Sequence, residues 1–123
     1  MELSGSTAIV TGGCSGLGHA TAIALREAGL NVALFDLNDE LGAQRVDEMG
    51  SENTAFFKVD VRDEAQVQSA IDGTKKAFGD IHLCVNCAGI APAKRILDKE
   101  GNAAPLDGFQ NTIDINLVGS FNV

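Results

Sequence analysis

The chain has 123 residues, 45% of them hydrophobic, and its formal net charge at pH 7 is -8. The length predicts one domain at most, and because no apolar run is long enough to cross a bilayer, we expect a soluble protein without membrane contacts. The acidic surplus argues against nucleic acid as a partner, since phosphate backbones attract basic surfaces.

The first elements predicted along the chain are a strand, a glycine-rich turn and a helix. Apolar residues 7–10 predict the strand, and residues 19–28 predict the helix. Between them the turn carries Gly12, Gly16 and Gly18. Such a turn aims backbone N–H groups at a pyrophosphate, and the positive end of the helix dipole faces the phosphates. The sequence therefore predicts a dinucleotide site that needs no Lys or Arg at this point.

The helix after this turn is expected to end at Gly29, since glycine is common just beyond helix C-termini. The spacing of its apolar residues predicts which side of the helix faces the sheet. The residues on that predicted face are Ala20, Ile23, Ala24 and Leu25.

A second buried strand is predicted at residues 31–35, and it is followed directly by Asp36. This carboxylate lies about 20 residues beyond the glycine turn, where a dinucleotide fold places the acid that binds a ribose. The alternative is a tight turn whose glycines serve only close packing, with Asp36 as a helix cap. We favour the dinucleotide interpretation because the strand, turn, helix and acid agree with one another.

The sequence also predicts which dinucleotide is bound. A 2′-phosphate would lie near the Asp36 carboxylate, and two like charges about 4 Å apart repel by about 4 kcal/mol at an effective dielectric of about 20. No basic residue stands in the turn at residues 13–15 or after the strand at residues 37–39 to offset that repulsion. We therefore expect NAD rather than NADP.

The middle of the chain repeats the alternation of helix and strand. Residues 40–49 predict a helix, and residues 54–59 and 81–87 predict strands that are covered on both faces. Asp63 is expected to cap a further helix that stops at Gly79. This order predicts an α/β fold with a doubly wound parallel sheet. The apolar face expected on the helix after Asp63 consists of Val67, Ala70, Ile71, Ala77 and Phe78.

The pattern changes after the fourth strand. Residues 91–105 are polar and contain two prolines, which predicts a loop that is either functional or disordered. A fourth helix is expected to start near Pro105, because apolar residues recur there at helical spacing. The residues that carry this spacing are Leu106, Phe109, Ile113, Leu117 and Phe121.

The three cysteines do not predict a metal site or a disulfide framework. Cys84 and Cys87 have the spacing of a metal or redox pair, but residues three apart on a strand point to opposite faces. No second pair is present, so we expect no metal. The opening residues lack a secretory leader and an Arg-rich transit peptide. We therefore expect a cytoplasmic protein, with the mitochondrial matrix as the alternative.

Four motifs occur in a fixed order: the turn at residues 11–18, the pair Asp60-Val61, the segment at residues 86–89 (Asn-Cys-Ala-Gly), and Asn116. Together they resemble the N-terminal half of the short-chain dehydrogenase/reductase family, over essentially the whole chain. The resemblance implies the first four strands and helices of a Rossmann-type, single-domain dehydrogenase. Residues 1–123 would be its NAD-binding portion, truncated before the catalytic Tyr and Lys segment.

The resemblance implies roles for residues of the turn and the second strand. Gly12, Gly16 and Gly18 would form the phosphate turn, on which Ser15 and Leu17 would contact the cofactor. Asp36 would accept hydrogen bonds from both hydroxyls of the adenosine ribose. Thr11 would tie the glycine turn to the segment that contains Ala88.

The resemblance assigns the adenosine end of the cofactor to the third and fourth strands. Asp60 would bind the adenine amino group, and the backbone of Val61 would donate a hydrogen bond beside it. Cys87 would lie where the chain passes the adenosine ribose, followed by Ala88 and Gly89, where a larger side chain would block the approach.

The catalytic set of the family is only partly matched. In that family a Tyr transfers the proton, a following Lys lowers its pKa, a Ser orients the substrate carbonyl, and an Asn in the fourth helix kinks that helix and holds a water. Asn116 matches this Asn, whereas the sequence contains no Tyr. The four motifs thus carry the cofactor half of an enzyme and one member of its catalytic set.

The expected activity is hydride transfer between NAD and a secondary alcohol or ketone. Residues 86–90 and 109–123 most resemble members that act on 3-hydroxyacyl thioesters, with hydroxysteroids as a lesser option, and such members are tetramers. One alternative is a non-catalytic NAD-binding module or degenerate relative. Another is a methyltransferase, whose turn usually has a glycine spacing that Gly12, Gly16 and Gly18 do not follow.

Overall fold

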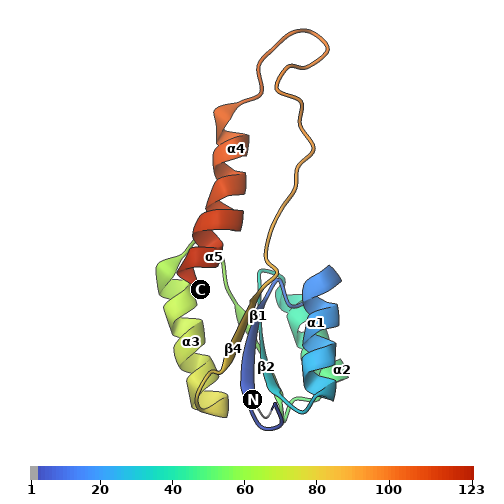
Figure 1. Cartoon of the computed structure of the whole chain (residues 1–123), viewed down its shortest axis with the longest axis vertical. Helices are drawn as coiled ribbons and strands as arrows, with labels where there is room; N and C mark the ends of the chain where they lie inside the picture. The colour runs from blue at the N-terminus through green and yellow to red at the C-terminus, as the bar shows by residue number, and fades with distance from the viewer. Residues whose placement is uncertain (1–2) are drawn as a thin grey trace.

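Four parallel strands form one sheet in the order β3-β2-β1-β4 (Figure 1). Each strand is rich in apolar or β-branched residues, which suits a sheet that is covered on both faces. In the computed structural model, which describes residues 3–123, the strands are β1 (Thr7–Thr11), β2 (Asn31–Asp36), β3 (Thr54–Lys58) and β4 (Leu83–Asn86).

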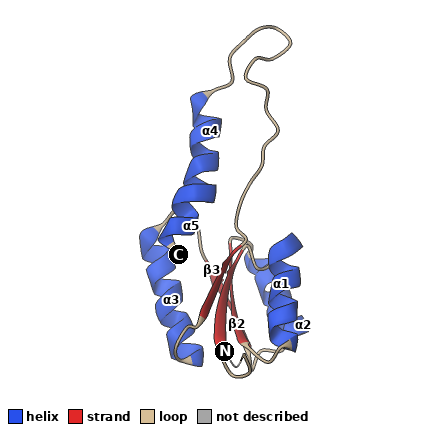
Figure 2. Ribbon diagram, viewed as in Figure 1, coloured by secondary structure: helices blue, strands red, loops and turns tan. Residues whose placement is uncertain are grey.

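Helices cover both faces of this sheet, as the doubly wound prediction requires (Figure 2). In that view α1 and α2 lie on one side, and α3 and α5 lie on the other. The prediction of the fold class is therefore confirmed. The helices are α1 (Gly16–Glu27), α2 (Asp39–Met49), α3 (Glu64–Phe78), α4 (Leu106–Ile113), the π-helical segment η1 (Asp114–Val118) and α5 (Gly119–Asn122).

The register of the strands places the carboxyl ends of all four strands at one edge of the sheet. Thr11, the last residue of β1, lies beside Phe35 of β2 and Asn86 of β4, and Asp36 lies beside Lys58 of β3. Because all strands are parallel, the segments that follow them leave the sheet at the same edge. This is where an open α/β sheet places its ligand.

Alternate residues of the strands pack into two separate hydrophobic cores, one on each face of the sheet. Val10 and Leu34 belong to the core beneath α1 and α2. Phe35 and Val59 belong to the core beneath α3, where the rings of Phe35 and Phe57 meet edge to face with centroids 5.9 Å apart. Both faces of β1 and β2 are thus buried by apolar packing, which explains the absence of strict alternation in their sequences. The expectation that the fourth strand is covered on both faces was wrong, because Cys84 and Asn86 of the edge strand β4 are exposed.

The buried face of α1 differs from the predicted one. Gly18 and Ala22 are buried and Leu25 packs against the core, at i, i+4 and i+7. An added Cβ on Gly18 would overlap the carbonyl oxygen of Gly12, so this glycine lies against the turn and sets the rotation of the helix. The prediction was correct for Leu25 alone. The predicted residues that instead are exposed are Ala20, Ile23 and Ala24.

The face of α3 was predicted well, with one exception. Asp63 caps this helix by accepting a hydrogen bond from the backbone N–H of Gln66, and Gly79 follows its last turn with φ of 83°. Val67 and Ala70 are buried, but Ala77 is exposed. Thr74 is buried instead. Its hydroxyl donates a hydrogen bond to the carbonyl of Ala70, so the buried hydroxyl has a partner within the helix.

The segment between β4 and α4 extends beyond the sheet together with α4 (Figure 1). It was predicted as a loop over residues 91–105, and it holds a small bridge between Leu97 and Ala103. Asp98 closes the turn inside this bridge by accepting hydrogen bonds from the backbone N–H groups of Glu100 and Asn102. Helix α4 begins at Leu106, as predicted, and then winds as a π-helix through η1.

Candidate cofactor site

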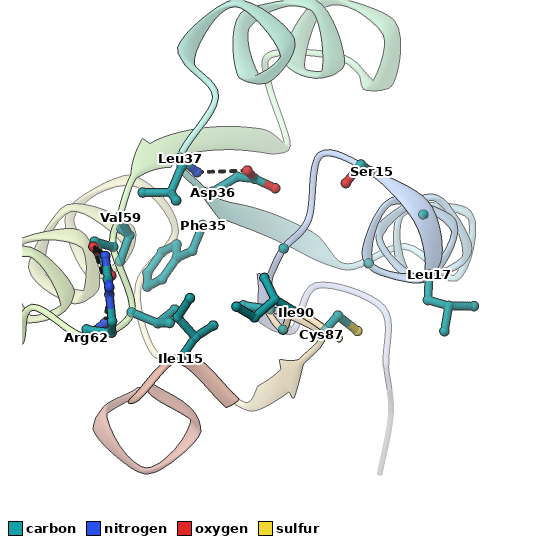
Figure 3. Close-up of a pocket in the computed structure, with 17 residues that line it drawn as sticks. Ser15, Leu17, Phe35, Asp36, Leu37, Val59, Arg62, Cys87, Ile90 and Ile115 are labelled. Atoms are coloured by element: carbon teal, nitrogen blue, oxygen red, sulfur yellow. Dashed lines mark hydrogen bonds and ion pairs between the residues drawn. The ribbon is translucent and has the colours of Figure 1, made fainter. Parts of the chain in front are cut away.

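A cavity of about 400 Å³ opens at the carboxyl edge of the sheet (Figure 3). Segments after all four strands contribute to it, and η1 adds Ile115. Every residue that the sequence assigned to cofactor binding lies in this lining. These residues are Gly12, Ser15, Gly16, Leu17, Gly18, Asp36, Asp60, Val61, Cys87, Ala88 and Gly89.

The glycine turn packs tightly against the segment after β4. Gly12 has φ of 61°, and an added Cβ there would lie 3.0 Å from the backbone nitrogen of Ala88. The hydroxyl oxygen of Thr11 accepts hydrogen bonds from the backbone N–H groups of Cys87 (3.1 Å) and Ala88 (3.0 Å). The expected tie between the turn and the Ala88 segment is therefore present.

The N-terminus of α1 faces the cavity with its N–H groups uncapped. Ser15 occupies the N-cap position, but its side chain makes no capping hydrogen bond, and the first turn holds no acidic residue. Leu17, beside it, is 84% exposed. Because the first N–H groups of a helix have no partner within the helix, this end suits an anionic group such as a diphosphate.

Asp36 is held by backbone groups. Its Oδ2 accepts a hydrogen bond from the N–H of Cys14 (3.1 Å), and its Oδ1 accepts one from the N–H of Leu37 (2.8 Å), which Figure 3 marks. Within residues 3–123, Asp36 forms no ion pair with Lys or Arg. Its charge therefore stays uncompensated at the cavity wall, which fits the hydroxyls of a ribose better than a phosphate.

A basic residue that contacts the glycine turn was missed by the sequence analysis. Arg45 of α2 donates from Nε to the carbonyl of Cys14 (3.1 Å), and its Nη1 pairs with Glu48 (2.7 Å). Arg45 does not line the cavity. No local pattern marks it, because helix α2 brings it back to the turn from 31 residues further along the chain.

The Cys14 thiol lies buried beneath this turn. Burial raises its pKa to about 11, and the negative charge of Asp36 adds to the effect. The thiol therefore stays protonated at neutral pH and acts as a small packing group in the core under α1.

Asp60 has a partner that the sequence analysis also missed. Arg62 places Nε 2.9 Å from Oδ1 and Nη2 2.6 Å from Oδ2 of this carboxylate. Hydrogen bonds from Arg62 hold the pKa of Asp60 below its usual range. The signal in the sequence is an opposite charge two residues after Asp60. The two residues share a turn, in which the N–H of Asp63 donates to the carbonyl of Asp60 and the N–H of Arg62 donates to the Asp60 side chain.

Asn116 lies in η1, and its side chain is hydrogen-bonded to the segment that follows β4. Its Oδ1 accepts a hydrogen bond from the N–H of Ile90 (2.9 Å), and its Nδ2 donates to the carbonyl of the same residue (2.8 Å). An added Cβ on Gly89 would lie 3.3 Å from that Oδ1. The side chain of Asn116 therefore clamps η1 to the segment after β4. The catalytic role expected of Asn116 stays a prediction.

The part of the chain that the structure describes, residues 3–123, has neither a metal-ligand cluster nor a membrane-spanning helix. In that part, no three His, Cys, Asp or Glu side chains gather at one point that could hold a metal ion. Cys84 is exposed on β4, whereas Cys87 lines the cavity. None of the helices between residues 3 and 123 has the length and apolar character needed to cross a membrane.

The parallel sheet, with its ligand cavity at the carboxyl edge, defines a Rossmann-like α/β protein. The model of the short chain dehydrogenase family matches residues 6–123. The chain therefore belongs to the short-chain dehydrogenase family.

Named relatives agree with this assignment. The chain is 41% identical over 123 residues to 3-hydroxyacyl-CoA dehydrogenase type-2 of Homo sapiens, covering 99% of this chain and 47% of the relative. It is 34% identical over 122 residues to secoisolariciresinol dehydrogenase of Forsythia intermedia, covering 98% and 42%.

A solved structure shows the same arrangement of elements. The crystal structure of 3-hydroxyacyl-CoA dehydrogenase type-2 from Mycobacterium avium matches with a TM-score of 0.90 and 36% identity, over 100% of this chain and 48% of that chain. The chain thus spans about half the length of the relatives it matches.

Proposed function

We propose that this chain is the NAD-binding portion of an oxidoreductase that moves hydride between nicotinamide and a secondary alcohol or ketone. The cofactor would supply or accept the hydride. The residues described here would hold its diphosphate at the α1 N-terminus, its adenosine ribose at Asp36 and its adenine at Asp60 and Val61. Asn116 would act by holding the α4–η1 helix against Ile90.

One observation carries this proposal. The uncapped N-terminus of α1 and the uncompensated carboxylate of Asp36 face the same cavity. The first suits two phosphates and the second suits two hydroxyls, and a dinucleotide carries both groups in that order.

Isothermal titration of the complete protein that contains this chain tests the cofactor. We expect NAD or NADH to bind in the micromolar range and NADP to bind at least about tenfold more weakly, because its 2′-phosphate meets the Asp36 charge. S-adenosylmethionine is the third titrant. Binding of that compound in place of NADH would contradict the proposal and support a methyltransferase.

Exchange of Asp36 for Asn tests the basis of the preference. Asp36→Asn keeps the shape of the side chain and removes its charge, so we expect the ratio of NAD to NADP affinity to fall by about tenfold or more. Asp39→Asn is the matched control, because it removes one charge from a neighbouring exposed acid. An unchanged ratio in Asp36→Asn would show that this carboxylate does not select the cofactor.

The substrate class rests on the relatives. Of the relatives named above, the human protein and the Mycobacterium avium protein are 3-hydroxyacyl-CoA dehydrogenases, and they match 99% and 100% of this chain at 41% and 36% identity. We expect the complete protein to oxidise a 3-hydroxyacyl thioester faster than a hydroxysteroid, and to be a tetramer. NADH absorbance with both substrates checks the first point, and light scattering checks the second.

A non-catalytic NAD-binding module is the second candidate, because these 123 residues contain no Tyr. The sequence beyond Val123 decides between the two. A Ser followed by a Tyr-x-x-x-Lys segment supports the enzyme, whereas NADH binding without turnover of any alcohol or ketone supports the module.

A further inference from the structure

We propose that Arg62 is a positioning residue of the cofactor site, which fixes the Asp60 carboxylate for adenine recognition and fastens it to helix α4. This inference rests on the proposed function, because it assumes that adenine lies at Asp60. It concerns a residue outside the four motifs that identify the family.

The geometry of Arg62 uses the whole guanidinium group. Nε and Nη2 hold the two oxygens of Asp60 as a fork, at 2.9 Å and 2.6 Å. The backbone N–H of Arg62 donates to Oδ1 of the same carboxylate at 3.0 Å. The remaining nitrogen, Nη1, donates to Oδ1 of Asn111 in α4 at 2.7 Å. One side chain thereby joins the segment after β3 to a helix 49 residues further along the chain.

This contact is better understood as positioning than as stabilisation of the fold. The Asp60 and Arg62 side chains are 24% and 42% exposed, and ion pairs at such exposure contribute little to stability. A two-point fork nevertheless fixes the plane and direction of a carboxylate, which a single contact does not. The consequence is one rotamer of Asp60 at the wall of the cavity.

The position of Arg62 agrees with the adenine end of the cavity. Figure 3 shows Arg62 and Val59 across the cavity from Ser15 and Leu17, and Asp36 lies on another side. A dinucleotide with its diphosphate at the turn and its ribose at Asp36 would extend its base toward Arg62. A carboxylate held there accepts a hydrogen bond from a base with an exocyclic amino group.

A second contact shows that the same segment is fastened to the helix at two points. Nδ2 of Asn122 in α5 donates to the carbonyl of Val61 at 2.9 Å. Gly119 lies so close to the Val61 side chain that an added Cβ would overlap it. Asn111 and Asn122 therefore flank Asn116, so the helix that carries Asn116 is held by the segment that would bind adenine.

Lysine could not replace this arginine. An ammonium group is a compact point charge, whereas the planar guanidinium presents donors in two directions at once. Arg62→Lys keeps the net charge and removes the fork and the reach to Asn111. Arg62→Gln removes the charge as well, and Lys76→Gln on the exposed surface of α3 is the control that matches this change in charge.

The test compares binding of NAD with that of nicotinamide hypoxanthine dinucleotide, titrated into the complete protein and its variants. The analogue carries a carbonyl oxygen where adenine carries its amino group, so a fixed Asp60 rejects it. We expect the unaltered protein to prefer NAD by roughly 10- to 100-fold, the range of one hydrogen bond to a charged group. We expect this preference to fall below about threefold in both Arg62→Lys and Arg62→Gln, and to persist in Lys76→Gln.

Each other outcome has a defined meaning. If Arg62→Lys retains the full preference, charge alone suffices and the positioning role is wrong. Asn111→Ala, which leaves the fork intact, is expected to lower the preference partly, and an unchanged value would overturn the link to α4. Failure of the unaltered protein to bind NAD would instead contradict the proposed function. Thermal melting of every variant identifies any that does not fold, and Asn111→Ala then carries the test.

Discussion

Two carboxylates at the cavity are held by different chemical groups, and the difference decides what each can bind. Asp36 is held only by backbone N–H groups, so its charge is uncompensated. Asp60 is held by the Arg62 guanidinium, so its charge is compensated. A phosphate would be repelled at the first, whereas the second offers a fixed hydrogen-bond acceptor with a weaker field.

The thiol of Cys14 provides a test at the scale of one residue. Its pKa is raised from 9.0 to about 11, so at about pH 8 its thiolate fraction should be about 100-fold lower than that of a free thiol. We expect iodoacetamide to label Cys14 slowly in the folded protein, with the rate rising tenfold per pH unit up to about 11. Mass spectrometry of the peptide that contains Cys14 measures this rate.

The control is the same peptide in protein unfolded by urea. Because the thiol ionises more easily in the unfolded chain, its contribution to the stability of the fold is complete below pH 9 and declines as the pH rises toward 11. Equally fast labelling in the folded and unfolded protein would mean that the turn is open to solvent.

At the scale of the element, the helix formed by α4, η1 and α5 is distinguished by three Asn side chains that bind other segments. Asn111 accepts from Arg62, Asn116 pairs with Ile90, and Asn122 donates to Val61. The π-helical segment η1 lies between the first and the last of these contacts. A π-helical turn rotates the residues that follow it around the helix axis. This rotation helps Asn111, Asn116 and Asn122, which are five and six residues apart, to contact the rest of the protein from one helix.

Removal of the clamp at Asn116 should loosen this helix. Asn116→Ala deletes two hydrogen bonds of about 1 kcal/mol each, so we expect hydrogen exchange at the Ile90 amide to rise by roughly 10- to 30-fold. Asn102→Ala, which alters an exposed contact in the loop, is the control. Unchanged exchange at Ile90 in Asn116→Ala would show that packing alone holds η1 in place.

Local patterns predicted the elements, but not all of their contacts. The glycine turn, the strand ends and the caps at Asp63 and Gly79 were predictable because each depends on neighbouring residues. The face of α1 was not, because it is set by the contact between Gly18 and the turn. The link from Arg62 to Asn111 was not predictable, since it appears only when α4 is placed beside the segment after β3.

At the scale of the whole molecule, the structure described over residues 3–123 leaves one edge of the sheet unpaired and one apolar helix surface uncovered. β4 pairs with β1 on one side only, so its other edge carries free backbone groups. The helix formed by α4, η1 and α5 also exposes large apolar side chains, among them Phe121, which is 92% exposed. Edges and patches of this kind favour association with other chains. The most exposed of these side chains are Leu106, Phe109, Leu117 and Phe121.

We therefore expect residues 1–123 expressed alone to self-associate and to be poorly soluble. Size-exclusion chromatography with light scattering measures the association, and the double variant Leu117→Gln/Phe121→Gln should reduce it by removing two exposed apolar groups. The complete protein is the control. A monodisperse monomer that melts cooperatively would contradict this expectation.

The cavity is assembled from the ends of all four strands, in segments that start at Gly12 and finish at Ile115. No part of such a site survives in the unfolded chain, so any molecule that fits it recognises the native state alone. By thermodynamic linkage, saturation at about 100 times the dissociation constant would add about 2.7 kcal/mol to the free energy of unfolding. The abundance of the ligand in a cell would then govern how long the protein escapes proteolysis as well as how fast it works.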